Sequence, residues 1–211
     1  MIKALIFSAL AVFSGFSQSL FAQNVVPPDV LARSVTDEVI AILRADPDAY
    51  TGNPVKVVGL IETKVLPHFN FVRMTRLAVG KNWRQAGPQQ REALIGEFRT
   101  LLVRTYATAF TAYRDQTIKY GPLRMRPEDD DVVVRSQIIQ QGGPPVAVDY
   151  NMEKTAKGWK VYDVTIEGVS LVQNYRSSFN SEVHRGGIDG LINALNSKNR
   201  QLAQKTQETA R

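Results

Sequence analysis

Residues 132–167 read VVVRSQIIQQGGPPVAVDYNMEKTAKGWKVYDVTIE, and apolar and polar side chains alternate in three runs of this stretch. The runs are 132–139, 146–152 and 159–167. A period of two gives each strand one apolar and one polar face, and the Gly/Pro-rich segment 141–144 is typical of a tight turn. The stretch therefore predicts a three-stranded antiparallel meander, which residues 118–123 extend with an edge strand.

A long amphipathic helix is predicted before the meander. Residues 88–113 repeat apolar side chains at helical spacing, and Pro88 suits the first turn of a helix. Helical spacing returns after the meander, from Val169 to Leu195, with a pause at Gly186-Gly187. Three shorter helices are predicted upstream, over residues 29–46, 55–66 and 70–80.

Helices, then a meander, then helices is the element order of an α+β fold. The simplest packing is a curved antiparallel four-stranded sheet cradled by long helices, with an added helical lobe. We place the folded domain at residues 23–200, with the helical lobe at about 23–86 and a sheet-and-helix lobe at about 87–200. Residues 201–211 form a polar tail that we expect to be frayed or disordered.

The first 22 residues predict a secretory signal peptide. Lys3 precedes the uncharged apolar run 4–16, and residues 17–22 are more polar and end in the small residue Ala22. The run is shorter than the roughly 20 residues that a membrane-spanning helix needs. We expect cleavage after Ala22, a soluble periplasmic protein, and a net charge that falls from +6 to +5 with the loss of Lys3. An exported basic protein meets anionic lipid surfaces rather than nucleic acid.

The composition removes most catalytic and metal chemistry. The chain has no cysteine and only two histidines, His68 and His184, which we interpret as structural. Ser170 lies in a Gly-Val-Ser-Leu-Val sequence that lacks the second glycine of a nucleophile elbow, so we interpret it as a helix-start residue. The acidic run 128–131 is typical of a solvated turn rather than a calcium loop. We therefore expect no enzyme activity, metal or cofactor.

Residues 63–91 contain no acidic residue but six cations. Two interpretations stay open for this stretch: a solvated helix face, or a docking surface for phosphate or for an acidic protein surface. The candidate docking residues are Arg73, Arg76, Lys81 and Arg84.

Several segments together resemble the MlaC family, also called the toluene-tolerance or ABC-transporter auxiliary family. They are FNF at 69–71, MTRLAVG at 74–80, Trp83, QR at 90–91, EFRTLLVRTYA at 97–107, WKVYDV at 159–164 and EGVSLV at 167–172, followed by Asn174-Tyr175-Arg176 and Phe179. The resemblance implies a fold similar to the nuclear-transport-factor-2 cone. It also implies a periplasmic carrier that moves a glycerophospholipid between an outer-membrane lipoprotein-porin complex and an inner-membrane ABC transporter with an MCE-domain subunit. Phospholipid is then cargo rather than a cofactor, and no nucleic acid is involved.

Under this resemblance the apolar sheet face and the helices become walls of a lipid chamber rather than a closed core. The expected lipid-binding residues are Met74, Leu77, Trp83, Phe98, Leu102, Tyr106, Val148, Tyr150, Met152, Val164, Ile166, Val169 and Tyr175. Two alternatives stay open. A cone fold can also house a secreted small-molecule isomerase or hydrolase, with Asp149, Tyr150 and Asp163 in its cavity, and the chain could instead be an envelope adaptor that binds no lipid.

Overall fold

The structure is a computed structural model that describes residues 25–50, 53–111, 116–140 and 142–209. The expected signal peptide, residues 1–22, lies outside the described residues. The helical elements are α1 (Pro28–Ala45), α2 (Pro47–Tyr50), α3 (Pro54–Leu60), the π-helix η1 (Ile61–Val65), the 3₁₀ turns η2 (Leu66–His68) and η3 (Gly80–Gln85), α4 (Phe71–Val79), α5 (Pro88–Thr111) and α6 (Leu171–Thr209). The strands are β1 (Thr117–Tyr120), β2 (Asp131–Ile139), β3 (Val146–Thr155), β4 (Gly158–Ile166) and β5 (Val169–Ser170).

The strands form one antiparallel sheet in the order β1-β2-β3-β4-β5. The predicted α+β class, the meander and its edge strand are confirmed, and β5 is a fifth strand that the sequence did not indicate. Glu167 and Gly168 both adopt positive φ, at 49° and 79°, and this turn folds Val169 and Ser170 back onto β4. Val169 was expected to begin the last helix, which instead begins at Leu171.

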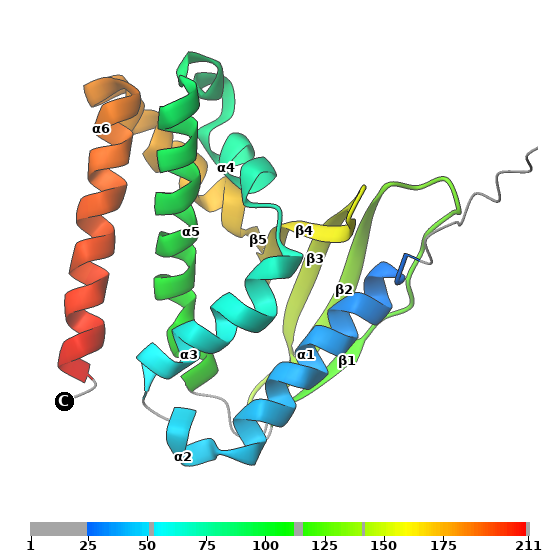
Figure 1. The fold of residues 1–211 in the computed structure, drawn as a ribbon. Helices are drawn as coiled ribbons and strands as arrows, with labels where there is room; N and C mark the ends of the chain where they lie inside the picture. Colours follow the sequence, from blue (N-terminus) through cyan, green and yellow to red (C-terminus); the bar gives the residue numbers. More distant parts are fainter. Residues whose placement is uncertain (1–24, 51–52, 112–115, 141, 210–211) are drawn as a thin grey trace, which may run out of the picture.

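The molecule has two halves that are visible in Figure 1. In the helical bundle, α4, α5 and α6 pack around one apolar core. In the sheet half, α1 lies across one face of the sheet, whereas α3 and η1 run between α1 and α5. The upstream helices are thus shared between the halves, because α1 packs on the sheet and α4 packs in the bundle. The helical lobe expected at residues 23–86 is divided accordingly.

α6 is longer than the sequence indicated. The predicted pause at Gly186-Gly187 is confirmed, since both residues have non-helical backbone angles, with φ of 67° at Gly187. Beyond it the helix continues to Thr209, so the expectation of a frayed or disordered tail was wrong for residues 201–209. The tail is ordered because α6 lies along α5: Leu202 packs on the bundle core, and the Asn199 amide donates to the Glu97 carbonyl at 2.9 Å.

Candidate functional site

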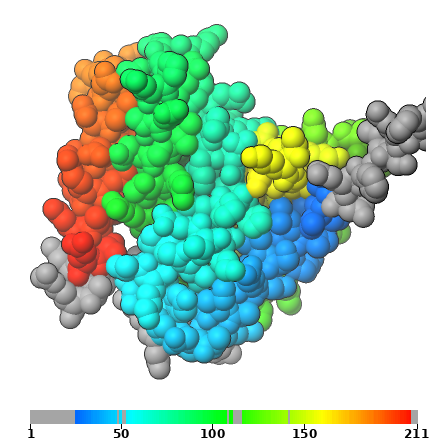
Figure 2. All heavy atoms as spheres, in the orientation of Figure 1, coloured from blue at the N-terminus to red at the C-terminus, as the bar shows by residue number. Residues whose placement is uncertain are grey.

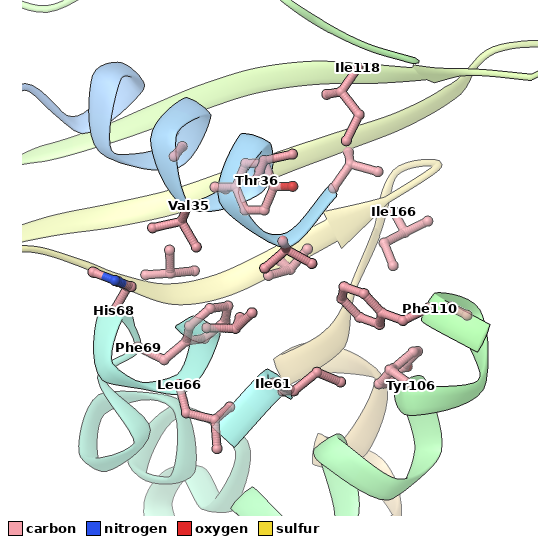
Figure 3. A pocket seen from close by; sticks show the side chains of 18 of the residues that line it. Val35, Thr36, Ile61, Leu66, His68, Phe69, Tyr106, Phe110, Ile118 and Ile166 are labelled. Carbon is pink, nitrogen blue, oxygen red and sulfur yellow. The ribbon is translucent and has the colours of Figure 1, made fainter. Parts of the chain in front are cut away.

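An apolar cavity of about 530 Å³ lies between α1, the sheet, α5 and the segment from Ile61 to Met74. Figure 3 shows side chains from all of these elements pointing into it. In Figure 2, α1 and the 54–68 segment meet along one side of the molecule, where Val39, Leu43 and Leu60 form a buried cluster. The volume falls within the range of small-molecule sites in proteins, roughly 300–1,000 Å³. The two halves therefore enclose space in place of a continuous core.

The sheet wall follows directly from strand alternation and register. Val134, Tyr150 and Val164 are cross-strand partners, as are Val148 and Ile166. A register shift between Asn151 and Met152 brings Val161 opposite Met152, so β4 presents both Val161 and Val164 to the cavity. One apolar face of the meander thus becomes a continuous cavity wall.

Eight of the thirteen residues expected to bind lipid line this cavity. They are Met74, Leu102, Tyr106, Val148, Tyr150, Met152, Val164 and Ile166. They come from α4, α5, β3 and β4, so the structure brings together residues that lie far apart in the sequence.

The other five expected residues do not line the cavity. Phe98 is fully buried in the bundle core, where its ring meets the rings of Tyr175 and Phe179 edge-on at 5.2 and 5.1 Å. Leu77 and Trp83 pack against the same core. Val169 is 55% exposed on β5. Leu77, Trp83, Phe98 and Tyr175 all belong to the core that α4, α5 and α6 share.

Sequence reasoning missed two walls of the cavity. One wall is α1, and the other is the η1–η2 segment with the residues that flank it. The missed residues include Leu31, Val35, Thr36, Val39, Leu43, Ile61, Val65, Leu66 and Phe69. The apolar stripe of α1 is visible in the sequence, but a stripe does not name the surface that it covers. The π-helix has no comparable sequence signature.

Hydroxyl groups lie in and behind the α1 and sheet walls of the cavity: Thr36 and Tyr150 line it, whereas Tyr120 and Ser136 do not. The Tyr120 hydroxyl donates to Thr36 Oγ1 at 2.8 Å, and the Ser136 hydroxyl donates to the Val148 carbonyl at 2.8 Å. Burial raises the pKa of Tyr120 to about 12 and also raises the pKa of Tyr150, so both phenols stay protonated at neutral pH. The α1 and sheet walls suit hydrocarbon, because the residues that line the cavity from these elements carry no charge and the hydroxyls behind them are partnered.

The predicted docking cations differ in their surroundings. Arg73 is engaged within the protein: Nη2 meets Asp131 Oδ2 at 2.8 Å, Nη1 meets Glu153 Oε2 at 2.7 Å, and the guanidinium lies 3.5 Å from the centre of the Tyr162 ring. This arrangement ties α4 to the outer side of the sheet, so the Arg73 guanidinium is already paired within the protein.

The remaining three docking cations, Arg76, Lys81 and Arg84, are exposed and form no ion pair with any residue that the structure describes. Arg176 joins them from α6. Gly80 directly precedes Lys81. If Gly80 carried a Cβ atom, that atom would lie 3.2 Å from Arg176 Nε, so the Arg176 guanidinium packs closely against the Gly80 backbone. Gly80 also has a positive φ of 62°, a conformation that disfavours other residues.

The residues considered for catalysis have structural partners. Ser170 Oγ donates to Asp163 Oδ2 at 2.5 Å and accepts from the Gln173 amide at 3.0 Å, as expected of a residue at a helix start. Asp163 also accepts from the Val172 amide at 3.1 Å. Neither Asp149 nor Asp163 lines the cavity. Across the described ranges, no three metal-ligating side chains gather at one place, and no helix is long and apolar enough to cross a membrane.

A curved antiparallel sheet, covering helices and an apolar cavity between them define an α+β protein built to hold an apolar ligand. Residues 33–197 match the family described as MlaC protein, and the chain belongs to this family. The resemblance seen in the sequence is thereby confirmed.

Two characterised relatives and one solved structure are similar to the chain. It is 25% identical over 171 residues to the intermembrane phospholipid transport system binding protein MlaC of Haemophilus influenzae, covering 80% of each chain. It is 25% identical over 166 residues to the toluene tolerance protein ttg2D of Pseudomonas putida, covering 77% of this chain and 75% of the relative. A phospholipid-binding protein from Ralstonia solanacearum, solved in complex with a phospholipid, superimposes with a TM-score of 0.79 at 41% identity and covers 84% of this chain and 99% of its own.

Proposed function

We propose that this protein binds a phospholipid, encloses its acyl chains in the cavity and carries it between membranes. The observation that carries the proposal is the apolar cavity of about 530 Å³ between the two halves. Membership of the MlaC family and the likeness to a phospholipid-bound structure support it. Removing one methylene from water is worth about 0.8 kcal/mol, so two chains of about 15 methylenes bind strongly only to a carrier that shields nearly all of them.

The enclosed chains also explain why a hollow protein can be stable. Missing contacts around an empty cavity cost free energy, whereas a ligand that binds only the native state restores those contacts and stabilises the fold. The described residues that line the cavity include no paired nucleophile and base, so we expect binding without chemical turnover.

The proposal also includes the cellular location of the carrier and the protein complexes that it would meet. The predicted signal peptide supports a periplasmic location, where a carrier would meet an outer-membrane lipoprotein-porin complex and an inner-membrane MCE-domain ABC transporter. Arg76, Lys81, Arg84 and Arg176 are the cations that we assign to docking, because they are exposed and carry no ion pair within the described ranges.

Lipid content of the purified protein tests the proposal. Val148→Trp adds an indole to the cavity wall, whereas Val72→Trp adds the same group at a 55% exposed position on α4. We expect the Val148→Trp protein to remain folded but to carry roughly tenfold less phospholipid in its organic extract, because the ring occupies space that the chains need. The Val72→Trp protein should carry the wild-type amount.

Mass spectrometry of the extract measures the phospholipid content, and circular dichroism on the same preparation shows whether the protein is folded. A folded Val148→Trp protein with a full complement of phospholipid would contradict the assignment of this cavity. Wild-type protein that contains no phospholipid, and takes none up from vesicles of phosphatidylethanolamine and phosphatidylglycerol, would contradict the proposed function itself.

A further inference from the structure

The helix α1 covers one side of the cavity and meets the rest of the protein along two flanks. Thr36 and Glu38 are two positions apart, which corresponds to about 200° of rotation around an α-helix, so they lie on opposite flanks. Thr36 contacts β1, and Glu38 contacts η1. Val35 and Val39 lie between the flanks and line the cavity. A ligand that enters beside α1 therefore has to separate one of these flanks from its neighbour.

The flank that faces β1 is held by several contacts of one tyrosine. The Tyr120 hydroxyl oxygen lies 2.8 Å from Thr36 Oγ1 and 3.2 Å from the Ala32 carbonyl oxygen. The guanidinium carbon of Arg33 lies 4.5 Å from the centre of the Tyr120 ring. Leu31 and Ala32 also pack against the apolar cluster of the sheet. These contacts fix the first half of α1 to the sheet.

The other flank meets η1 and η2 along a boundary that we call the α1–η1 seam. In Figure 2, α1 in blue meets residues 54–68 in cyan along the surface of the molecule. Val39, Leu43 and Leu60 are buried together and close one part of the seam. Nearer the start of α1, Val35 and His68 line the cavity at the same end but are only half-buried, as Figure 3 shows from inside. The cavity lining therefore reaches solvent at this part of the seam.

An exposed ion pair joins the two sides of the seam. Lys64 Nζ of η1 lies 2.6 Å from Glu38 Oε1 of α1, and the side chains are 40% and 49% exposed, respectively. Ion pairs at this exposure contribute little to stability and are screened by salt. Separating Glu38 from Lys64 therefore costs less than removing α1 from Tyr120, whose partners include a backbone carbonyl.

The η1 side of the seam lies between two fixed parts of the chain. Before it, Val57 of α3 is fully buried. After it, the Asn70 amide donates to the Val161 carbonyl at 2.8 Å, and Phe69 forms a β-bridge with the same residue. η1 itself is a π-helix, a rare geometry that often marks functional sites. A shift of η1 away from α1 would therefore leave the packing of α3 and the attachment to β4 in place.

We propose that the α1–η1 seam is the portal through which acyl chains enter and leave the cavity, and that the Glu38–Lys64 ion pair holds it closed. The proposal rests on the proposed function and deepens it, because it gives the route of the lipid and the contact that controls the rate. Two other routes are possible in principle. One is the boundary between α1 and β1, and the other is the end of the cavity where Phe110 and Ile118 lie.

Crosslinking across the seam tests the route directly. The chain has no cysteine, so Glu38→Cys with Lys64→Cys introduces the two thiols of the protein. A short bis-thiosulfonate crosslinker joins them, and a reducing agent releases them again. We expect the crosslinked protein to exchange fluorescent phosphatidylglycerol with vesicles about tenfold more slowly or less, because the portal stays closed. Reduction should restore the rate of the uncrosslinked variant.

The matched control is the same crosslink on the opposite flank. Arg33→Cys with Tyr120→Cys joins α1 to β1, and its crosslinked and reduced forms should exchange lipid at rates within about twofold of each other. An unchanged rate after closure of the seam would overturn the portal, and so would equal inhibition by the two crosslinks. Uncrosslinked protein that takes up no phospholipid would instead reject the proposed function.

Charge variants test the ion pair separately from the route. Glu38→Lys or Lys64→Glu should raise the rates of uptake and release about two- to fivefold and leave the amount of lipid bound at equilibrium unchanged. Combining the two substitutions restores opposite charges and should return the rate towards the wild-type value. Glu62→Lys, at an exposed position on η1, is the control and should leave the rate unchanged. Equal rates in the wild type and in both single variants would show that the ion pair does not hold the portal closed.

Discussion

The interface between α5 and α6 and the interface between α1 and the sheet both bury apolar side chains, yet the first is filled and the second is hollow. In the bundle, the Phe98, Tyr175 and Phe179 rings meet at centroid distances of 5.1–5.6 Å and leave little space. In the sheet half, the facing side chains are mainly short and branched, as in Val35 of α1 and Val148 of β3. Short side chains on surfaces held apart by α3 and η1 do not meet in the middle. The length of the facing side chains, rather than their hydrophobicity, therefore decides whether an apolar interface is filled or encloses a cavity.

Replacement of one leucine in each interface should give the largest difference between them. Leu94 is fully buried in the bundle, and Leu43 is 5% exposed but lines the cavity. Leu94→Ala should lower the free energy of unfolding by about 4 kcal/mol, whereas Leu43→Ala should lower it by about 2 kcal/mol in delipidated protein, because one side of Leu43 faces empty space. Urea denaturation measures both values. Equal losses would show that the cavity closes around Leu43 when no lipid is present.

The two arginines on α4 should separate stability from docking. Arg73→Met leaves Asp131 and Glu153 without their cation and should lower the free energy of unfolding by about 1–2 kcal/mol, a value reduced by the partial exposure of the pairs. Arg76→Met, three residues away on the same helix, should leave stability within about 0.5 kcal/mol. Arg76→Met should instead weaken association with the membrane complexes that we propose as partners, and more so at low salt. If Arg73→Met weakened association without any loss of stability, Arg73 would belong to the docking surface after all.

The hydroxyl network of the sheet half should make it the more alkali-sensitive region. Burial raises the pKa of Tyr120 from 10.0 to about 12, so the unfolded chain loses this proton at a lower pH than the folded protein. The contribution to stability is therefore fully present below pH 10 and is lost as the pH rises through about 12. Tyr120→Phe should flatten the fall in urea midpoint across this range relative to the wild type. An unchanged slope would mean that the phenol is accessible to solvent in the folded protein.

The contrast between the two interfaces also explains what the sequence could predict. Strands β1 to β4 and α5 were predicted because their periods are local, and Val148, Tyr150 and Met152 were placed on one face by alternation alone. Phe98 was assigned to the cavity because a pattern reports burial without naming the covering element, which is α6.

The missed parts of the site depend on distant contacts. The stripe of α1 has its partner on the sheet about 100 residues later, and its place was fixed only by tertiary packing. The π-helical Ile61 and Val65 reach the cavity through a hydrogen-bond pattern that leaves no period in the sequence. Leu202 packs on the bundle core in a segment that is otherwise mostly polar, so one narrow apolar contact left too weak a pattern in the sequence to predict the end of α6.

A hollow interface also gives the protein a mechanical property, namely sensitivity to hydrostatic pressure. Apolar cavities of this kind stay dry, and pressure favours the unfolded chain in proportion to the void that unfolding eliminates. The space of about 530 Å³ between α1 and the sheet is such a void when no lipid fills it. The lipid-free protein should therefore be more compressible in the sheet half than in the bundle. Bound acyl chains should remove this difference, because they fill the void.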